Sequence, residues 1–118
     1  MQINLTELKS SIPAEVLDTI LLRAVKQVKD DAQQYHQAIE ATDYAQGAQL
    51  IHRMRGLALF LGVAEIELMQ LRGLEDELAA SSAKNPQTPL GIAVFSARFD
   101  VFRESFESAL LNVRDAAK

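Results

Sequence analysis

The chain has 118 residues, a length that suits one domain, because two independently folded halves would each be near the lower size limit of a stable core. Apolar residues make up 48% and charged residues 24%, which excludes wholesale disorder. The net charge of −4 has the wrong sign for binding nucleic acid or anionic lipid, and the absence of cysteine excludes disulfides, thiol nucleophiles and thiolate metal sites. With no apolar run near the ~20 residues of a membrane span and no secretory signal pattern, we expect one soluble, cytoplasmic domain over residues 1–118.

Apolar residues recur with the helical period of 3.6 throughout the chain, without an alternating strand pattern. Residues 4–10 form a short lead-in of one or two helical turns. The first long helix is predicted from Pro13, which is tolerated in a first turn with Ser11 in the cap region, to Ala41. Its core-facing residues are predicted to be Leu17, Ile20, Leu21, Ala24, Val28, Ala32, Tyr35 and Ile39.

The second helix begins with a capping-box signature, since Asp43 is followed three residues later by Gln46. Gly62 is a natural stop for this helix. The residues predicted to face the core are Tyr44, Ala48, Ile51, Met54, Ala58 and Leu61.

A third helix is predicted over residues 63–80, burying Ile66, either Met69 or Gln70, Leu74 and Leu78. The turn-rich segment 81–88 follows, and Thr88 is predicted to cap a final helix with Pro89 at its first position. That helix carries a core stripe made of Phe95, Phe99, Phe102, Phe106, Ala109 and Val113. The fold class is therefore all-α, an antiparallel up-down four-helix bundle with a short N-terminal lead-in helix.

Most catalytic sites are excluded by residue type. His36 and His52 are the only histidines, so the chain cannot assemble a usual tetrahedral metal site without scattered carboxylates. It contains no glycine-rich phosphate loop, nucleophile elbow or HExxH spacing. The acidic run 75–77 is interpreted as a solvated face, because adjacent helical residues point in different directions. His36 lies among glutamines and is interpreted as an exposed surface histidine.

His52 differs because helical periodicity places it more than a quarter turn away from the core-facing residues of its helix. Its imidazole should point to the flank of the bundle or into water, on a stripe shared with Gln49, Arg55, Gly56 and Leu59. A mid-helix glycine costs about 1 kcal/mol relative to alanine. Gly56 therefore serves either close helix packing or clearance beside the imidazole for a partner. Arg55 adds positive charge near the ring, which is useful if the ring carries a phosphoryl group.

The sequence His52-Arg53-Met54-Arg55-Gly56, with Gly62 ten residues after the histidine, resembles the H-x-x-K-G…G signature of histidine-containing phosphotransfer (HPt) domains of two-component phosphorelays. The resemblance also covers the long amphipathic helix, the turn at 41–44, Ile66 where the family usually has leucine, and the lead-in 3–8. It implies that His52 is the phospho-acceptor and that Arg55 takes the place of the usual lysine. Gly56 is then the clearing glycine, and Gly62 ends the helix.

The resemblance also implies a function. His52 would accept a phosphoryl group from a receiver aspartate and pass it to another response-regulator receiver. The chain has no ATP-binding signature, so we expect no autokinase activity and no cofactor, with Mg²⁺ held only by the partner receiver. Receiver domains and a hybrid sensor kinase are the expected partners of a monomeric chain. Gln49, Arg53, Leu59 and Val63 are the residues expected to contact them, although Leu59 and Val63 also suit packing against a neighbouring helix.

Three departures from the family pattern leave alternatives open, the first being the arginine in place of lysine at position 55. The run 57–61 is bulkier than the family prefers, and Leu74 stands where many members place a glutamine or glutamate near the imidazole. Gln70 or Glu75 could take that role. The competing interpretation is an interaction module that binds a kinase or receiver without carrying phosphate, which a buried His52 would favour. A helical scaffold or assembly adaptor is the third alternative.

Overall fold

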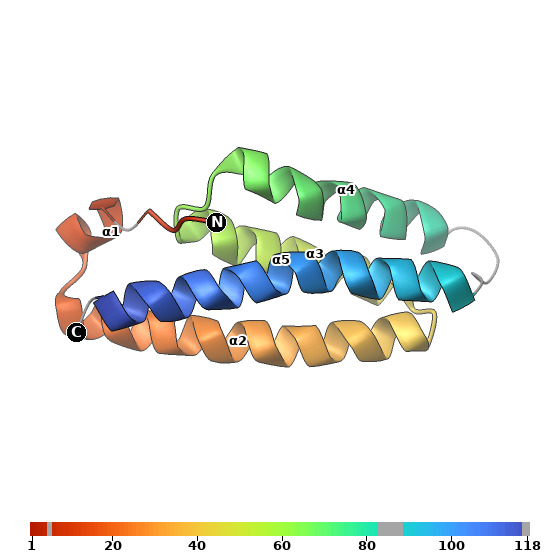
Figure 1. Cartoon of the computed structure of the whole chain (residues 1–118), viewed down its shortest axis with the longest axis horizontal. Helices are drawn as coiled ribbons and strands as arrows, with labels where there is room; N and C mark the ends of the chain where they lie inside the picture. Colours follow the sequence, from red (N-terminus) through yellow and green to blue (C-terminus); the bar gives the residue numbers. More distant parts are fainter. Residues whose placement is uncertain (5, 83–88, 117–118) are drawn as a thin grey trace.

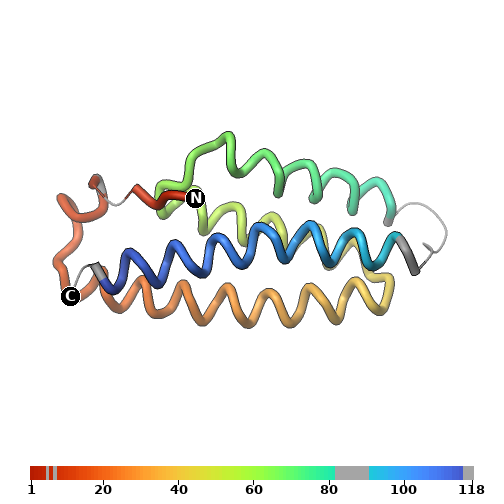
Figure 2. The backbone as a smooth tube through the Cα atoms, in the orientation of Figure 1, coloured from red at the N-terminus to blue at the C-terminus, as the bar shows by residue number. Residues whose placement is uncertain are grey.

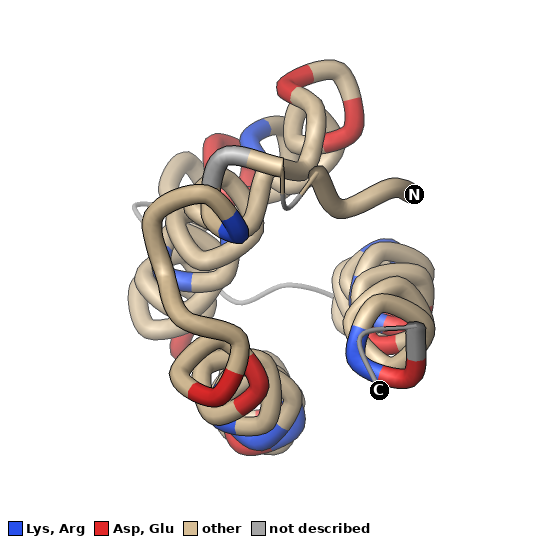
Figure 3. The backbone as a smooth tube through the Cα atoms, turned by 90° about the vertical axis from the view of Figure 1, so that its left-hand side faces the viewer, with Lys and Arg blue, Asp and Glu red and all other residues tan. Residues whose placement is uncertain are grey.

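The computed structural model describes residues 1–4, 6–82 and 89–116, and these contain helices and no strand. The helices, labelled in Figure 1, are α1 (Thr6–Ser11), α2 (Ala14–Glu40), α3 (Tyr44–Phe60), α4 (Glu65–Ser82) and α5 (Pro89–Ala116). The four long helices run in alternating directions, as the tube in Figure 2 shows. Viewed end-on in Figure 3, they stand around one common core, with α2 packed on α3 and α5, and α4 packed on α3 and α5. The predicted all-α bundle with a short N-terminal helix is confirmed.

Aromatic residues join α2 to α5 in the core. The four phenylalanines of the predicted α5 stripe are buried, and so are the α2 positions predicted to face the core, except Ile20, which is partly buried. The Tyr35 ring stacks on Phe99 with 4.1 Å between centroids, and its hydroxyl donates a hydrogen bond to the Phe95 carbonyl at 3.1 Å. Burial raises the pKa of the Tyr35 hydroxyl. Ring stacking and a hydrogen bond therefore join the long helices α2 and α5 in the core.

The register of α4 differs from the prediction. Leu74 and Leu78 are buried as expected, and Leu68 and Leu71 complete the buried stripe. Ile66 and Met69 are instead 75% and 67% exposed, and Gln70 is also exposed. Ile66 precedes Leu68 by two residues, about 200° around the helix, so both cannot face the core. The leucines bury more apolar surface together, and the solvent side of α4 is therefore left with two large apolar side chains.

Two helices end in the same backbone motif, with different residues at its left-handed position. At the end of α2, Thr42 has a φ of 55°, and at the end of α3, Gly62 has a φ of 82°. In each case the residue after it donates its backbone N–H back to a carbonyl five residues earlier, Asp43 to Ala38 and Val63 to Ala58. Glycine adopts this conformation without strain, whereas a β-branched residue does so at a cost.

Position 62 must also lack a side chain, because the backbone of the N-terminal segment packs directly against Gly62. A Cβ placed on Gly62 would collide with the backbone carbonyl oxygen of Asn4. The turn that places α4 relative to α3 is therefore held by backbone conformation and by close packing together.

The helix ends confirm part of the predicted capping. The Asp43 side chain accepts a hydrogen bond from the Gln46 backbone N–H at 3.2 Å, which confirms the N-cap of α3. Pro13 is the N-cap residue of α2 and no side chain caps this helix, while Ser11 ends α1 instead. The predicted cap of α5, Thr88, lies outside the described residues.

Candidate functional site

His52 stands on the outer surface of α3 with its side chain 70% exposed. Its neighbour Ile51 is completely buried, as is Ala58 about two turns after Ile51. Because successive helical residues are about 100° apart, burying these residues turns the histidine away from the core. The prediction that the imidazole lies outside the bundle is confirmed.

The imidazole is held from the neighbouring helix by Glu75 of α4. The distance from His52 Nδ1 to Glu75 Oε1 is 2.8 Å, and the Glu75 side chain is only 16% exposed. A carboxylate only accepts hydrogen bonds, so Nδ1 must carry the proton of this contact. Nε2 has no hydrogen-bond partner among the described residues. When the ring is neutral, Nε2 is then the unprotonated nitrogen and presents its lone pair to solvent.

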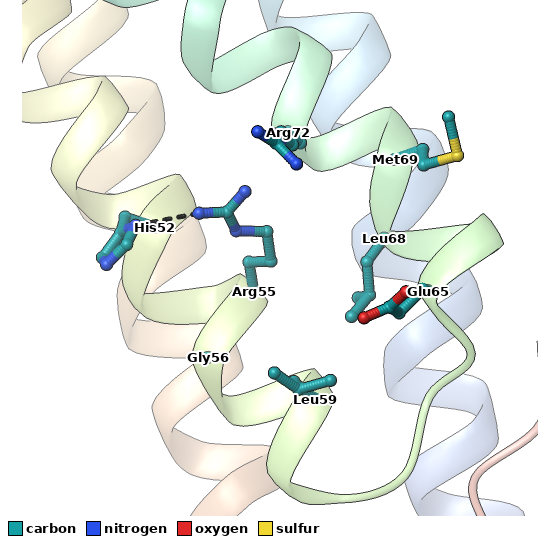
Figure 4. A pocket seen from close by; sticks show the side chains of 8 residues that line it. All are labelled: His52, Arg55, Gly56, Leu59, Glu65, Leu68, Met69 and Arg72. Carbon is teal, nitrogen blue, oxygen red and sulfur yellow. Dashed lines mark hydrogen bonds between the residues drawn. The ribbon is translucent and has the colours of Figure 1, made fainter.

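Arg55 completes a three-residue cluster around the imidazole. Its Nη2 atom lies 3.2 Å from Glu75 Oε2 and 3.2 Å from His52 Nδ1, the latter contact being the dashed line in Figure 4. Since Nδ1 donates its proton to Glu75, the guanidinium finds its acceptor in the other Glu75 oxygen. Arg55 thus compensates the Glu75 charge and restricts the carboxylate to one orientation, which in turn restricts the rotation of the ring.

Gly56 leaves a bare patch on the helix next to the histidine. A Cβ built on Gly56 would meet nothing within 4 Å. Close helix packing, the first of the two explanations offered by the sequence, is therefore wrong, because no neighbouring helix approaches this position. Clearance for something outside the molecule is the explanation consistent with the structure.

A groove between α3 and α4 begins at this patch, and we call it the α3–α4 groove. Its volume is about 560 Å³, and Figure 4 labels the eight residues that line it: His52, Arg55, Gly56, Leu59, Glu65, Leu68, Met69 and Arg72. Leu59 is 55% exposed and Met69 67% exposed, whereas Leu68 is buried at the bottom of the groove. The histidine therefore lies at the edge of an apolar depression that is open to a partner.

The residues predicted to contact a partner fall into different environments. Gln49 and Leu59 are exposed on α3, as such contacts require. Val63 is only 3% exposed, so its assignment to the partner surface is wrong. It follows the turn at Gly62 and packs into the core, which was the alternative that the sequence allowed.

Arg53 makes an internal contact that the sequence did not reveal. It binds Asp31 of α2 through two hydrogen bonds, Nη2 to Oδ1 at 2.5 Å and Nε to Oδ2 at 3.2 Å. The Asp31 side chain is 2% exposed and also accepts a hydrogen bond from Gln27. A buried carboxylate is stable only with such partners. Arg53 therefore joins α3 to α2 directly behind the histidine, although 53% of its side chain still faces solvent.

Glu75 and Arg72 are the site residues that sequence reasoning did not place. Glu75 was assigned to a solvated acidic face and was also one of two candidates to support the imidazole; the structure selects it over Gln70. The spacing of 23 residues between His52 and Glu75 becomes a contact only because the α3–α4 turn brings the two helices together antiparallel. The sequence could have indicated this contact through Leu74 and Leu78, because burying these two leucines in the core turns residue 75 toward α3.

The second histidine provides an internal comparison. His36 was expected to be exposed, but its side chain is 35% exposed and its Nε2 lies 2.9 Å from Asp100 Oδ1 on α5. Its ring also makes an edge contact with Phe99, 5.9 Å between centroids. Nε2 is thus occupied in His36 and free in His52. Between the two histidines, only His52 offers that nitrogen to an approaching molecule.

The described residues contain no group of three or more His, Asp or Glu side chains that could hold a metal ion. Within the same residues, no helix combines the length and the apolar character that crossing a bilayer requires. Comparisons with protein-family models, with curated proteins and with solved structures found no match to this chain.

Proposed function

We propose that this chain is a phosphorelay intermediate of the HPt type, in which His52 accepts a phosphoryl group from a receiver aspartate and passes it to another response-regulator receiver. The observation that supports this proposal most is the state of the imidazole. It is 70% exposed, its Nδ1 is held by Glu75 at 2.8 Å, and no side chain occupies the space above Gly56. A histidine held in this way is oriented for nucleophilic attack and is open to a macromolecular donor.

The tautomer determines which ring nitrogen attacks in the transfer step. The Nε2 lone pair attacks the phosphorus of the aspartyl phosphate, a P–N bond forms, and the P–O bond breaks with its electron pair leaving on the aspartate carboxylate. Nδ1 keeps its proton, and the positive charge that develops on the ring is stabilised by the Glu75 carboxylate. The reverse sequence of bonds delivers the group to a second receiver.

Arg55 contributes through charge. Without it, Glu75 would place an uncompensated negative charge beside an incoming phosphoryl group, which is itself an anion. The guanidinium at 3.2 Å from Glu75 cancels this repulsion while leaving the hydrogen bond to the imidazole in place. Phosphoryl transfer depends mainly on positioning and charge neutralisation, and both functions are supplied here by two side chains.

The remaining groups belong to the partners in this proposal. Mg²⁺ and the residues that activate the aspartyl phosphate are held by the receiver domain, and a hybrid sensor kinase supplies the phosphoryl group upstream. The chain itself acts as a carrier, without autokinase activity, in the cytoplasm.

The test is a phosphotransfer profile against the phosphorylated receiver domains of the source organism. Wild type should acquire an acid-labile, base-stable label. His52→Gln should lose the label, whereas the same substitution at the other histidine, His36→Gln, should retain it. A label that persists in His52→Gln refutes the proposal. A receiver or kinase that binds the chain without labelling it supports the alternative, a non-phosphorylated interaction module.

A further inference from the structure

Among the described residues, Asp31 is the one charged side chain that is buried. It lies on α2, and its carboxylate accepts two hydrogen bonds from the Arg53 guanidinium and one from the Gln27 side chain, the latter at 2.8 Å. Replacing a buried ion pair by apolar side chains of similar volume is often neutral or even stabilising, because both charges lose their hydration on burial. Stability by itself therefore does not explain why a charge is buried between α2 and α3.

The position of Arg53 offers another explanation, because this residue directly follows His52. The helix that carries both residues, α3, packs against α2 on one side and against α4 on the other (Figure 3). Successive residues of a helix point about 100° apart, so Arg53 reaches α2 while His52 reaches Glu75 on α4. Two adjacent side chains thus attach α3 to both of its neighbours.

The apolar contacts of α3 specify its rotation less tightly than these polar ones. Ile51 and Met54 are buried beside the histidine, but hydrophobic attraction is non-directional, and apolar cores lose uniqueness before they lose stability. An arginine that donates two hydrogen bonds to one carboxylate is instead held in a single orientation. A rotation of α3 by about 20° would displace an atom about 6 Å from the helix axis by about 2 Å. Such a displacement would break the hydrogen bond of 2.8 Å between His52 and Glu75.

We propose that the ion pair of Asp31 and Arg53 is a positioning device for His52, which fixes the rotation of α3 about its axis and so keeps the imidazole within hydrogen-bonding distance of Glu75. This inference rests on the proposed function for its effect on phosphotransfer, whereas the orientation of the ring can be measured without any phosphoryl donor. Asp31 and Arg53 are positioning residues in this arrangement, since both act through the orientation of the histidine.

The test replaces the pair by apolar side chains of similar shape in the double variant Asp31→Leu/Arg53→Met. Urea unfolding should give a free energy equal to or above that of wild type, whereas phosphotransfer from a receiver to His52 should slow at least about tenfold. In ¹⁵N spectra of the neutral histidine rings, wild-type His52 should show a protonated Nδ1 and an unprotonated Nε2. The double variant should show shifts averaged over both tautomers. His36, whose Nε2 is bound to Asp100, should keep its shifts and provides the internal reference.

The matched control removes another ion pair between helices by the same two substitutions. Asp18→Leu/Arg114→Met eliminates a pair that joins α2 to α5, with 3.6 Å between Asp18 Oδ1 and Arg114 Nε, and should leave the His52 shifts and the transfer rate unchanged. The single variant Arg53→Lys keeps the positive charge but cannot form the two parallel hydrogen bonds. It should retain the fold and move the His52 shifts part of the way toward those of the double variant.

The outcomes separate this inference from the proposed function. A folded double variant that keeps the wild-type His52 shifts and receives phosphate at the wild-type rate overturns the inference alone. The same conclusion follows if the double variant does not fold and Arg53→Lys keeps the wild-type shifts, because the pair is then only structural. If the shifts average in the double variant but no receiver labels wild type, the positioning inference stands and the phosphorelay proposal fails.

Discussion

Substitution of Gly56 should raise stability and lower phosphotransfer at the same time. Gly56 is in the middle of α3, and a side chain there would meet nothing within 4 Å. Only the helix propensity therefore changes, and alanine is favoured over glycine in a helix interior by about 0.8–1.0 kcal/mol. For a domain of this size, that gain corresponds to a rise of roughly 4 °C in the melting temperature. Gly56→Leu should gain nearly as much, since leucine is also a strong helix former.

Transfer should respond in the opposite sense. A leucine at position 56 fills the space beside the imidazole and holds a docking receiver away from Nε2. Displacement by about 1 Å is enough to slow a positioned reaction roughly a hundredfold. Gly56→Ala should have a smaller effect, because a methyl group fills little of the gap.

The assay combines thermal or urea unfolding with the rate of phosphotransfer from a receiver. Gly73→Ala is the matched control: it adds the same methyl group to α4, where the added Cβ only reaches ordinary contact with Arg98 at 4.0 Å. It should stabilise the protein without slowing transfer. Phosphoramidate, a donor too small to need docking, should label Gly56→Leu at the wild-type rate. A Gly56→Leu variant that is stable and receives phosphate from receivers at the wild-type rate refutes the clearance argument.

Five further variants follow from the described contacts. Glu75→Gln keeps a hydrogen-bond acceptor but loses the carboxylate charge, so receiver-to-histidine transfer should slow by about tenfold while the melting temperature changes little. Gly62→Ala should lower the free energy of unfolding by at least about 2 kcal/mol, because alanine is strained in the left-handed conformation and its Cβ also collides with the N-terminal segment. A urea titration that shows a smaller loss would contradict this prediction. Arg53→Ala should lower the free energy of unfolding by about 3 kcal/mol, because it leaves the buried Asp31 carboxylate without its cation. Asp31→Ala should lower it by about 2 kcal/mol, because the arginine left unpaired is half-exposed to solvent. Equal losses in the two variants would contradict the explanation by burial. Burial raises the pKa of Tyr35 above its ordinary value of 10.0, so its protonated form stabilises the fold below pH 10 and this contribution is lost as the pH rises further. Unfolding measured from pH 8 to 12 should show a shallower alkaline loss in Tyr35→Phe.

The local features of the bundle were predictable from neighbouring residues alone. The helical period, the Asp43 cap and the left-handed Gly62 each depend on contacts within a few positions along the chain. The exposure of His52 also follows from periodicity, once the buried face of its helix is known. The four buried phenylalanines of α5 were predicted in the same way, because a helix with one regular apolar stripe can bury that stripe in only one rotational orientation.

Where the apolar pattern was ambiguous, packing between helices decided the register. On α4, Ile66 and Met69 compete with Leu68 and Leu71 for the buried face, and a local pattern cannot rank two overlapping stripes. Val63 was ambiguous for the same reason. Only the neighbouring helices α3 and α5 determine which set fills the available volume.

The parts of the candidate site that come from different helices depended entirely on the tertiary structure. Glu75 reaches His52 across 23 positions of sequence, and Arg53 reaches the buried Asp31 across 22. Such contacts are set by the angle and offset between packed helices, which sequence periodicity does not encode. The sequence by itself therefore determined which histidine is exposed and what chemistry its neighbours on α3 allow. The tertiary structure decided which carboxylate orients the ring and where an apolar groove opens beside it.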